Sequence, residues 1–162
     1  MTMRVVFFDF DGVLHPFGGG PDRLFQRMKE VYPLLEAHPD VRMVVHSSWR
    51  EIHDDAEFMD FLFCDRPELA HRLLGSTTRE IPSRWESIED WAKKHPEAGP
   101  LCILDDEPRL FPSHIAQNLD ERFKFIACET KLGLYRDSPA LNQLVDWLSL
   151  TVRTSQSSSS SG

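Results

Sequence analysis

Cysteine is scarce in this sequence, and it has no long apolar run. The three cysteines, Cys64, Cys102 and Cys128, are odd in number and widely spaced, so they predict neither a disulfide framework nor a zinc site. No apolar run approaches the roughly 20 residues that a membrane-spanning helix needs. Residues 1–4 lead directly into a strand-like run and lack the pattern of a secretory signal. We therefore expect a protein of the reducing cytoplasm that does not contact a membrane.

Basic residues are also in the minority. The chain has 18 Lys and Arg against 26 Asp and Glu, which gives a formal net charge of −8 at pH 7. This balance argues against nonspecific binding of nucleic acid or anionic lipid through a basic face, but leaves a nucleic-acid terminus open as a substrate. The length and composition are typical of a soluble globular protein with one core. We expect one domain over residues 1–150 and a disordered Ser-rich tail, native or appended, over 151–162.

What the sequence does contain is an apolar strand that ends in acids. A run of strand length finishes at Asp9 and Asp11, two acids one residue apart, and Gly12 then allows a sharp turn. Carboxylates this close repel each other unless a cation or strong donors lie between them. Mg²⁺, which prefers oxygen ligands, is the simplest such cation. The alternative is that both acids only end the strand and bind turn amides.

A second apolar run has the same ending. Residues 101–104 lead into Asp105 and Asp106, far along the chain from Asp9. Strands alternate with helices between the two pairs, which predicts right-handed crossovers and a mostly parallel sheet covered on both faces. Ligands bind such open sheets at the carboxyl ends of the strands. We therefore expect a three-layer α/β/α Rossmann-like sandwich in which the acids converge at one edge.

The other elements follow from periodicity and capping residues. We expect further strands at 41–46 and 123–127, with another strand signal around 73–75. Helices are expected at 22–37, 54–63, 65–74, from Ser83 to about 92, and from Ser138 onward. Helical spacing gives the first and last of these an apolar face, formed by Leu24, Met28, Val31 and Leu35, and by Leu141, Leu144, Val145 and Leu148.

Several polar residues near the predicted edge are candidate substrate contacts. Ser47 and Ser48 follow the second strand, where a hydroxyl can bind a phosphoryl oxygen or simply cap a helix. Arg84 lies in the first turn of a helix, where its charge opposes the helix dipole. That position favours a functional role, beside the alternative of a tolerated surface arginine. Arg50 could bind an anionic substrate or could simply be solvated. The loop around residues 18–20 could be a flap that faces the substrate or a plain connector.

In their order along the chain, these residues resemble a known family. Residues 9–14 (DFDGVL), Ser47-Ser48, Arg84 and Asp105-Asp106 are similar to the four motifs of haloacid dehalogenase-like phosphohydrolases. The resemblance extends over residues 4–148. More narrowly, residues 46–50, the helix from Arg84 and Gly133-Leu134 resemble a small subgroup of these domains linked to RNA repair proteins.

The resemblance implies an Mg²⁺-dependent phosphatase that works through an aspartyl-phosphate. Asp9 would be the nucleophile, and Asp11 would protonate the leaving oxygen and later activate water. The expected metal ligands are Asp9, Asp105, Asp106 and the backbone carbonyl of Asp11. Ser47 would orient the phosphoryl group, with Ser48 as the alternative. The expected substrate contacts are Ser48, Gly12, Arg50 and His15, with His15 at the rim of the site.

The chain departs from the family pattern in the third motif, which usually supplies a lysine. Arg84 is the expected substitute, with Arg50 and Arg79 as competitors, because a guanidinium can also stabilise phosphoryl charge. The short loop from His15 predicts a core without a cap domain and hence an open site. That favours a bulky substrate such as a nucleic-acid terminus, a nucleotide or a phosphoprotein. The missing lysine also leaves open a non-catalytic module that retains the fold and binds metal, phosphate or a protein.

Overall fold

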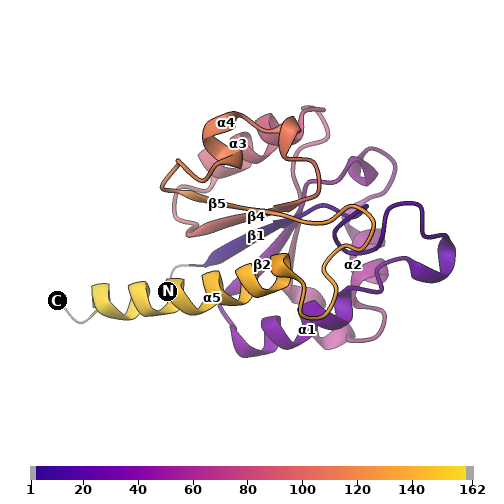
Figure 1. Ribbon diagram of the computed structural model, residues 1–162, viewed down its shortest axis with the longest axis horizontal. Helices are drawn as coiled ribbons and strands as arrows, with labels where there is room; N and C mark the ends of the chain where they lie inside the picture. Colours follow the sequence, from indigo (N-terminus) through magenta and orange to yellow (C-terminus); the bar gives the residue numbers. More distant parts are fainter. Residues whose placement is uncertain (1–2, 160–162) are drawn as a thin grey trace.

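A computed structural model describes residues 3–159, with side chains described for residues 3–152. Five strands form one parallel sheet in the order β3-β2-β1-β4-β5 (Figure 1). Because the chain starts at the central strand and fills first one side and then the other, the order reverses at β1, between β2 and β4. The strands are β1 (Arg4–Phe8), β2 (Val41–Val45), β3 (Leu73–Ser76), β4 (Leu101–Asp105) and β5 (Phe123–Ala127).

Helices cover both faces of the sheet, so the predicted α/β/α sandwich is confirmed (Figure 1). Alternation along β1 separates two cores, since Val6 and Phe8 face one layer while Val5 and Phe7 face the other. The first core is covered by α1 (Met28–Ala37), α2 (Asp55–Phe63) and α5 (Pro139–Ser159). The second is covered by α3 (Arg84–Lys94) and α4 (Ser113–Ala116).

Capping residues fix the helix starts that matter for the site. Asp54 and Glu57 form a capping box at the start of α2. Ser83 caps α3, because its Oγ accepts a hydrogen bond from the Glu86 amide at 3.3 Å. The sequence predicted both starts, and the second places Arg84 in the first turn of α3, close to the carboxyl edge of the sheet.

The first predicted helix is wrong over its opening residues. Pro21–Arg23 is a short 3₁₀ helix, and α1 begins only at Met28. Phe25 interrupts the helical pattern with φ of 57°, and its ring packs on Phe10 at a centroid distance of 5.0 Å. Aromatic packing therefore outweighs local helix propensity here, and Leu24, expected in the core, is exposed.

Two further expectations about elements need correction. The helix expected over 65–74 is a 3₁₀ helix, Pro67–Arg72, followed directly by β3, which confirms the strand signal around residue 73. On α5, Val145 is exposed rather than buried. That helix also continues to Ser159, into the range 151–162 where a disordered tail is expected; that expectation stays a prediction, and 160–162 lie outside the described residues.

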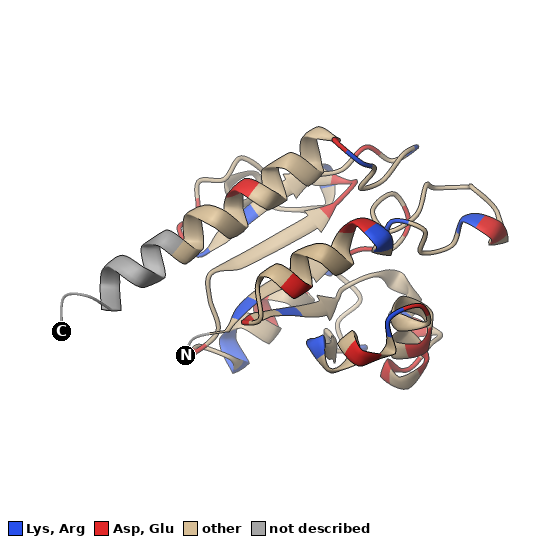
Figure 2. Cartoon of the chain, turned by 90° about the horizontal axis from the view of Figure 1, so that it is seen from below, with Lys and Arg blue, Asp and Glu red and all other residues tan. Residues whose placement is uncertain are grey.

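Charged residues of both signs lie mainly on the helices and loops, while the strands are largely uncharged (Figure 2). This is the pattern expected of a parallel sheet buried on both faces. Among the described helices, none has the length and apolar character to cross a membrane.

Candidate functional site

The carboxyl ends of β1 and β4 bring three acids together. Asp9, Asp105 and Asp106 each offer a carboxylate oxygen, and these oxygens lie within 4.8 Å of one another. The two strands are paired neighbours, and the Asp9 amide donates to the Leu104 carbonyl at 3.2 Å. Parallel pairing therefore aligns the residues that follow both strands, as the sequence predicts. The Asp11 carboxylate does not belong to this group.

Gly12 leaves room for the acidic cluster. Its φ is +78°, a conformation that other residues rarely adopt. A Cβ atom at this position would lie 2.3 Å from Asp106 Oδ2, which is far inside van der Waals contact. The glycine thus permits both the sharp turn after β1 and the close approach of the Asp106 carboxylate. A direct contact of Gly12 with substrate stays a prediction.

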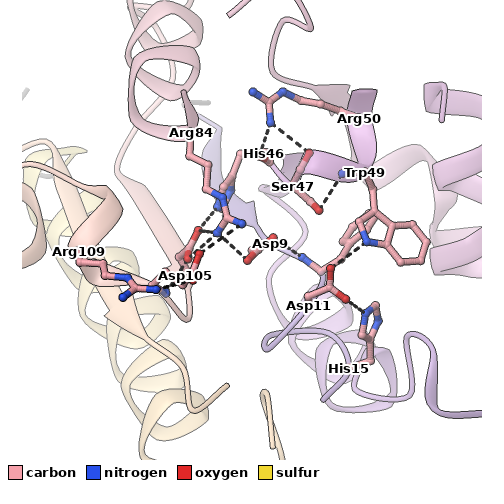
Figure 3. A network of polar contacts seen from close by, with 12 residues as sticks. Asp9, Asp11, His15, His46, Ser47, Trp49, Arg50, Arg84, Asp105 and Arg109 are labelled. Carbon is pink, nitrogen blue, oxygen red and sulfur yellow. Dashed lines mark hydrogen bonds and ion pairs between the residues drawn. The ribbon is translucent and has the colours of Figure 1, made fainter. Parts of the chain in front are cut away.

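Arg84 links the acids that end the two strands (Figure 3). Its Nη1 donates to Asp9 Oδ2 at 3.0 Å and lies 2.9 Å from both carboxylate oxygens of Asp105. Its Nη2 lies 3.7 Å from Glu107 Oε2. The Arg84 side chain is only 18% exposed, so solvent screens these ion pairs weakly. Among the three candidate arginines, Arg84 is the one that reaches the expected nucleophile.

Burial and neighbouring charges shift the pKa values of the three acids in different directions. Burial raises the pKa of Asp9 well above its ordinary value, and the charge of Asp105 adds to this more than Arg84 offsets it. Burial and the charge of Asp105 also raise the pKa of Asp106. Burial opposes ionisation of Asp105 as well, but hydrogen bonding to His46 and the charge of Arg84 outweigh it and lower the pKa. Asp105 is therefore the most strongly ionised member.

The residues present fit a hard divalent cation. Three carboxylates gather beside one guanidinium, which contacts Asp9 and Asp105, so the ionised cluster would hold more negative than positive charge. Burial first, and then the charge of Asp105, raise the pKa of Asp9, which a bound cation would oppose. All the offered donors are carboxylate oxygens, which Mg²⁺ prefers. Asp9, Asp105 and Asp106 are the side chains that could hold the ion.

His46 is a buried contact of the site that the sequence analysis did not assign. It follows β2, is fully buried, and places Nε2 2.8 Å from Asp105 Oδ2. Burial lowers the pKa of His46, so the neutral ring donates this hydrogen bond. Such a donor orients a carboxylate that binds metal. The available signal was a histidine directly after the apolar residues Met43, Val44 and Val45 of the strand.

The structure distinguishes the two serines. Ser47 is buried at the end of β2, and its Oγ accepts a hydrogen bond from the Trp49 amide at 3.2 Å. It caps the short 3₁₀ helix Ser48–Glu51, as one alternative proposed. Ser48 is exposed. Capping uses Oγ as an acceptor and leaves its proton available to donate to another oxygen, so capping does not exclude a phosphoryl contact.

Asp11 lies beside the acidic cluster but has different partners (Figure 3). Its Oδ1 lies 2.8 Å from His15 Nε2, and its Oδ2 accepts a hydrogen bond from Trp49 Nε1 at 3.1 Å. His15 is only 2% exposed and both of its ring nitrogens face protein atoms, which argues against its expected place at the rim, while a contact with substrate stays a prediction. The sequence analysis did not foresee either partner of Asp11.

Arg50 and Arg79 are engaged elsewhere. The Arg50 guanidinium is buried and donates to the carbonyls of His46, Ser47, Ile81 and Pro82. Its interpretation as a substrate contact is therefore wrong, because these backbone acceptors occupy it. Arg79 donates to the carbonyls of Arg50 and His53, so neither arginine competes for the third-motif position.

Comparison with known proteins agrees with this geometry. A family model described as the HAD domain in Swiss Army Knife RNA repair proteins matches residues 5–138. Comparisons with curated proteins and with solved structures gave no match. The matched region contains β2 to β5, β1 from its second residue onward, and the whole acidic cluster. Membership suggests a phosphohydrolase-type function. The chain thus belongs to the family of HAD domains found in Swiss Army Knife RNA repair proteins.

Proposed function

We propose that this chain is an Mg²⁺-dependent phosphatase that acts through an aspartyl-phosphate on Asp9. The observation that carries the proposal is the position of Asp9, which is buried at the end of β1 within reach of Asp105, Asp106 and Arg84. The ionised carboxylate is the nucleophile in such a reaction, and a cation bound among the three acids would favour that form of Asp9 against the burial and the charge of Asp105 that raise its pKa. The catalytic unit would be a single domain over residues 1–150, acting in the cytoplasm.

The proposed reaction has two displacements at phosphorus. In the first, an Asp9 oxygen forms a bond to phosphorus while the bond to the leaving oxygen breaks, and Asp11 gives that oxygen its proton. In the second, Asp11 takes a proton from water as the water oxygen attacks phosphorus, which frees inorganic phosphate and restores the Asp9 carboxylate. Arg84, which already contacts Asp9 Oδ2, would stabilise the charge on the transferred group.

Asp9, Asp105 and Asp106 would hold Mg²⁺ with the Asp11 carbonyl, the ligand that the family resemblance adds. When bound, the ion would shield the nucleophilic carboxylate from the negative charge of the phosphate. The Ser47 hydroxyl would orient the phosphoryl group, since its proton is free to donate. His46 would hold Asp105 in place through its buried hydrogen bond.

The proposed substrate class rests on the short connection between β1 and β2. Between β1 and β2 the chain forms a loop, a 3₁₀ turn and α1, and the described residues contain no cap-sized insertion. We propose that a bulky phosphomonoester reaches the site, with an RNA or DNA terminus or a nucleotide as the preferred class. Membership of a family named for RNA repair proteins supports this choice.

The second candidate is a non-catalytic module that keeps the fold and binds metal or phosphate. The observation in its favour is Arg84, which bridges Asp9 and Asp105 where the family pattern has lysine. The ion pair with Arg84 could prevent the Asp9 carboxylate from attacking a substrate.

A substrate panel separates the two candidates. Purified chain with Mg²⁺ is assayed for phosphate release from RNA and DNA carrying 3′- or 5′-phosphates, from nucleotides and from an aryl phosphate. The enzyme proposal predicts release that Asp9→Asn abolishes. Phosphate release that persists in Asp9→Asn would remove the nucleophile assignment. Saturable Mg²⁺ and phosphate binding without turnover of any substrate would favour the binding module.

A further inference from the structure

Two ring N–H groups hold the carboxylate of Asp11. His15 Nε2 lies 2.8 Å from Oδ1, and Trp49 Nε1 donates to Oδ2 at 3.1 Å, so each oxygen has its own partner (Figure 3). The Asp11 side chain is 39% exposed, whereas His15 is buried. A half-exposed carboxylate would otherwise rotate freely in solvent. Here both of its oxygens are tied to rigid rings.

The surroundings of His15 determine which nitrogen carries the proton. Its Nδ1 lies 3.2 Å from the amide nitrogen of Phe25, which can only donate, so Nδ1 is the acceptor. The proton of the neutral ring is therefore on Nε2, facing Asp11 Oδ1. The backbone is also fixed, because the Gly12 amide donates to the His15 carbonyl at 2.8 Å. Phe25 presents its amide from a backbone with φ of 57°.

Trp49 is held just as firmly, but by packing. Its ring lies against Phe10, Phe25 and Phe61, with centroid distances of 5.5, 5.3 and 6.3 Å. The indole N–H is a donor only, so Asp11 must accept from it. Trp49 belongs to the segment after β2, whereas His15 follows β1. Asp11 is therefore clamped between two loops of the sheet edge.

We infer that His15 and Trp49 are positioning residues that hold Asp11 in the orientation needed to protonate the leaving oxygen and to activate water. This inference rests on the proposed function, in which Asp11 is the acid and base. General acid–base catalysis requires the donor oxygen within hydrogen-bond reach of the reacting atom. Small displacements of a catalytic group can lower rates strongly. Neither ring would contact the substrate, since both act through Asp11.

Leaving-group dependence distinguishes this role from simple support of the fold. A poor leaving group such as an alkoxide needs the proton from Asp11, whereas 4-nitrophenolate departs with little help. The variants are Trp49→Phe, which removes the N–H but keeps a ring, and His15→Leu, with His15→Gln to restore a donor. Phe63→Leu is the matched control, because Phe63 lies on the same helix as Phe61 and is buried, but packs on Tyr32 at 6.1 Å and is not among the rings named above as holding Trp49.

We measure kcat and KM with 4-nitrophenyl phosphate and with an alkyl phosphate, after checking folding by circular dichroism. General acid–base catalysis supplies about 10²–10⁴-fold, so Trp49→Phe and His15→Leu should lower kcat/KM, which reports departure of the leaving group, about tenfold or more for the alkyl ester. The aryl ester should lose severalfold less of its kcat/KM. His15→Gln should regain part of the loss, and Phe63→Leu should lower kcat/KM for both esters by the same small factor.

Equal losses on both esters in Trp49→Phe and His15→Leu, or no loss in either, would overturn the positioning role while leaving the proposed function intact. Wild-type chain that hydrolyses neither ester nor any nucleic-acid phosphate would instead refute the proposed function, and the positioning role with it. Persistent turnover in Asp9→Asn would also refute the proposed function. The two failures are therefore distinguishable.

Discussion

Replacement of Arg84 with alanine removes a guanidinium that contacts Asp9 and Asp105 together. Both acids are buried, so neither can turn to water when its partner is lost. The variant should therefore be less stable than the wild type in the absence of metal. It should also respond more strongly to Mg²⁺, because a cation in the acidic cluster replaces the lost positive charge.

The size of the effect follows from burial. Removing one partner of a buried ion pair costs about 3–5 kcal/mol. The Arg84 side chain is 18% exposed, so we take the lower end, about 3 kcal/mol. For a domain of this size 1 kcal/mol corresponds to about 2–4 °C, which predicts a fall in Tm of roughly 6–12 °C.

The assay is thermal unfolding with EDTA and with saturating Mg²⁺. Arg109→Ala is the control, because its side chain is 83% exposed and pairs only loosely with Glu107 at 3.4 Å. That change should alter stability by less than about 0.5 kcal/mol. A fall below about 2 °C for Arg84→Ala, or equal Mg²⁺ shifts in variant and wild type, would refute the charge balance described for the cluster.

Three other substitutions test separate features. Burial and the charge of Asp105 raise the pKa of Asp9 in the folded state. The folded state therefore binds the Asp9 proton more tightly than the unfolded state does. This contribution to stability is fully present below the ordinary carboxyl pKa and is lost as pH rises through the raised pKa. Asp9→Asn should therefore raise the Tm of the metal-free chain more at about pH 7 than near pH 4, and an equal effect at both would contradict the shift. Gly12→Ala should cost about 1–3 kcal/mol through its positive φ and weaken Mg²⁺ binding in calorimetry through the clash with Asp106; unaltered binding would argue against that contact. Arg50→Met should cost at least about 3 kcal/mol in denaturant unfolding, because it leaves buried carbonyls unpaired, yet should not change KM; a raised KM would return Arg50 to the substrate site.

The sequence predicted the parts of the fold that depend on local pattern. β5 follows from an apolar run, α2 from its helical pattern, and α3 from Ser83, a cap that acts within a few residues of itself. The convergence of Asp9 with Asp105 and Asp106 followed from strand endings and the rule of parallel sheets. In each case the information lay within one element or in the order of elements.

The features that could not be predicted from the sequence depend on contacts between distant segments. Phe25 is not helical because its ring packs on Phe10 and Trp49. The stabilisation from this packing cannot be predicted from the spacing of apolar residues. His15 was placed at the rim because it follows the acids, whereas an amide and a carboxylate enclose it. Arg50 and Arg84 look alike in sequence, and only the positions of backbone carbonyls and acids separate their roles.

The central claim is that Asp9 accepts phosphorus, and trapping the intermediate tests it most directly. The chain is acid-quenched during turnover of an aryl phosphate with Mg²⁺, reduced with borohydride, and digested for peptide mass spectrometry. Reduction of an acyl phosphate converts the aspartate that carried it to homoserine. We predict homoserine at position 9 only, and none without substrate or in Asp9→Asn. An unmodified Asp9 during continued turnover, or modification at another acid, would contradict the account.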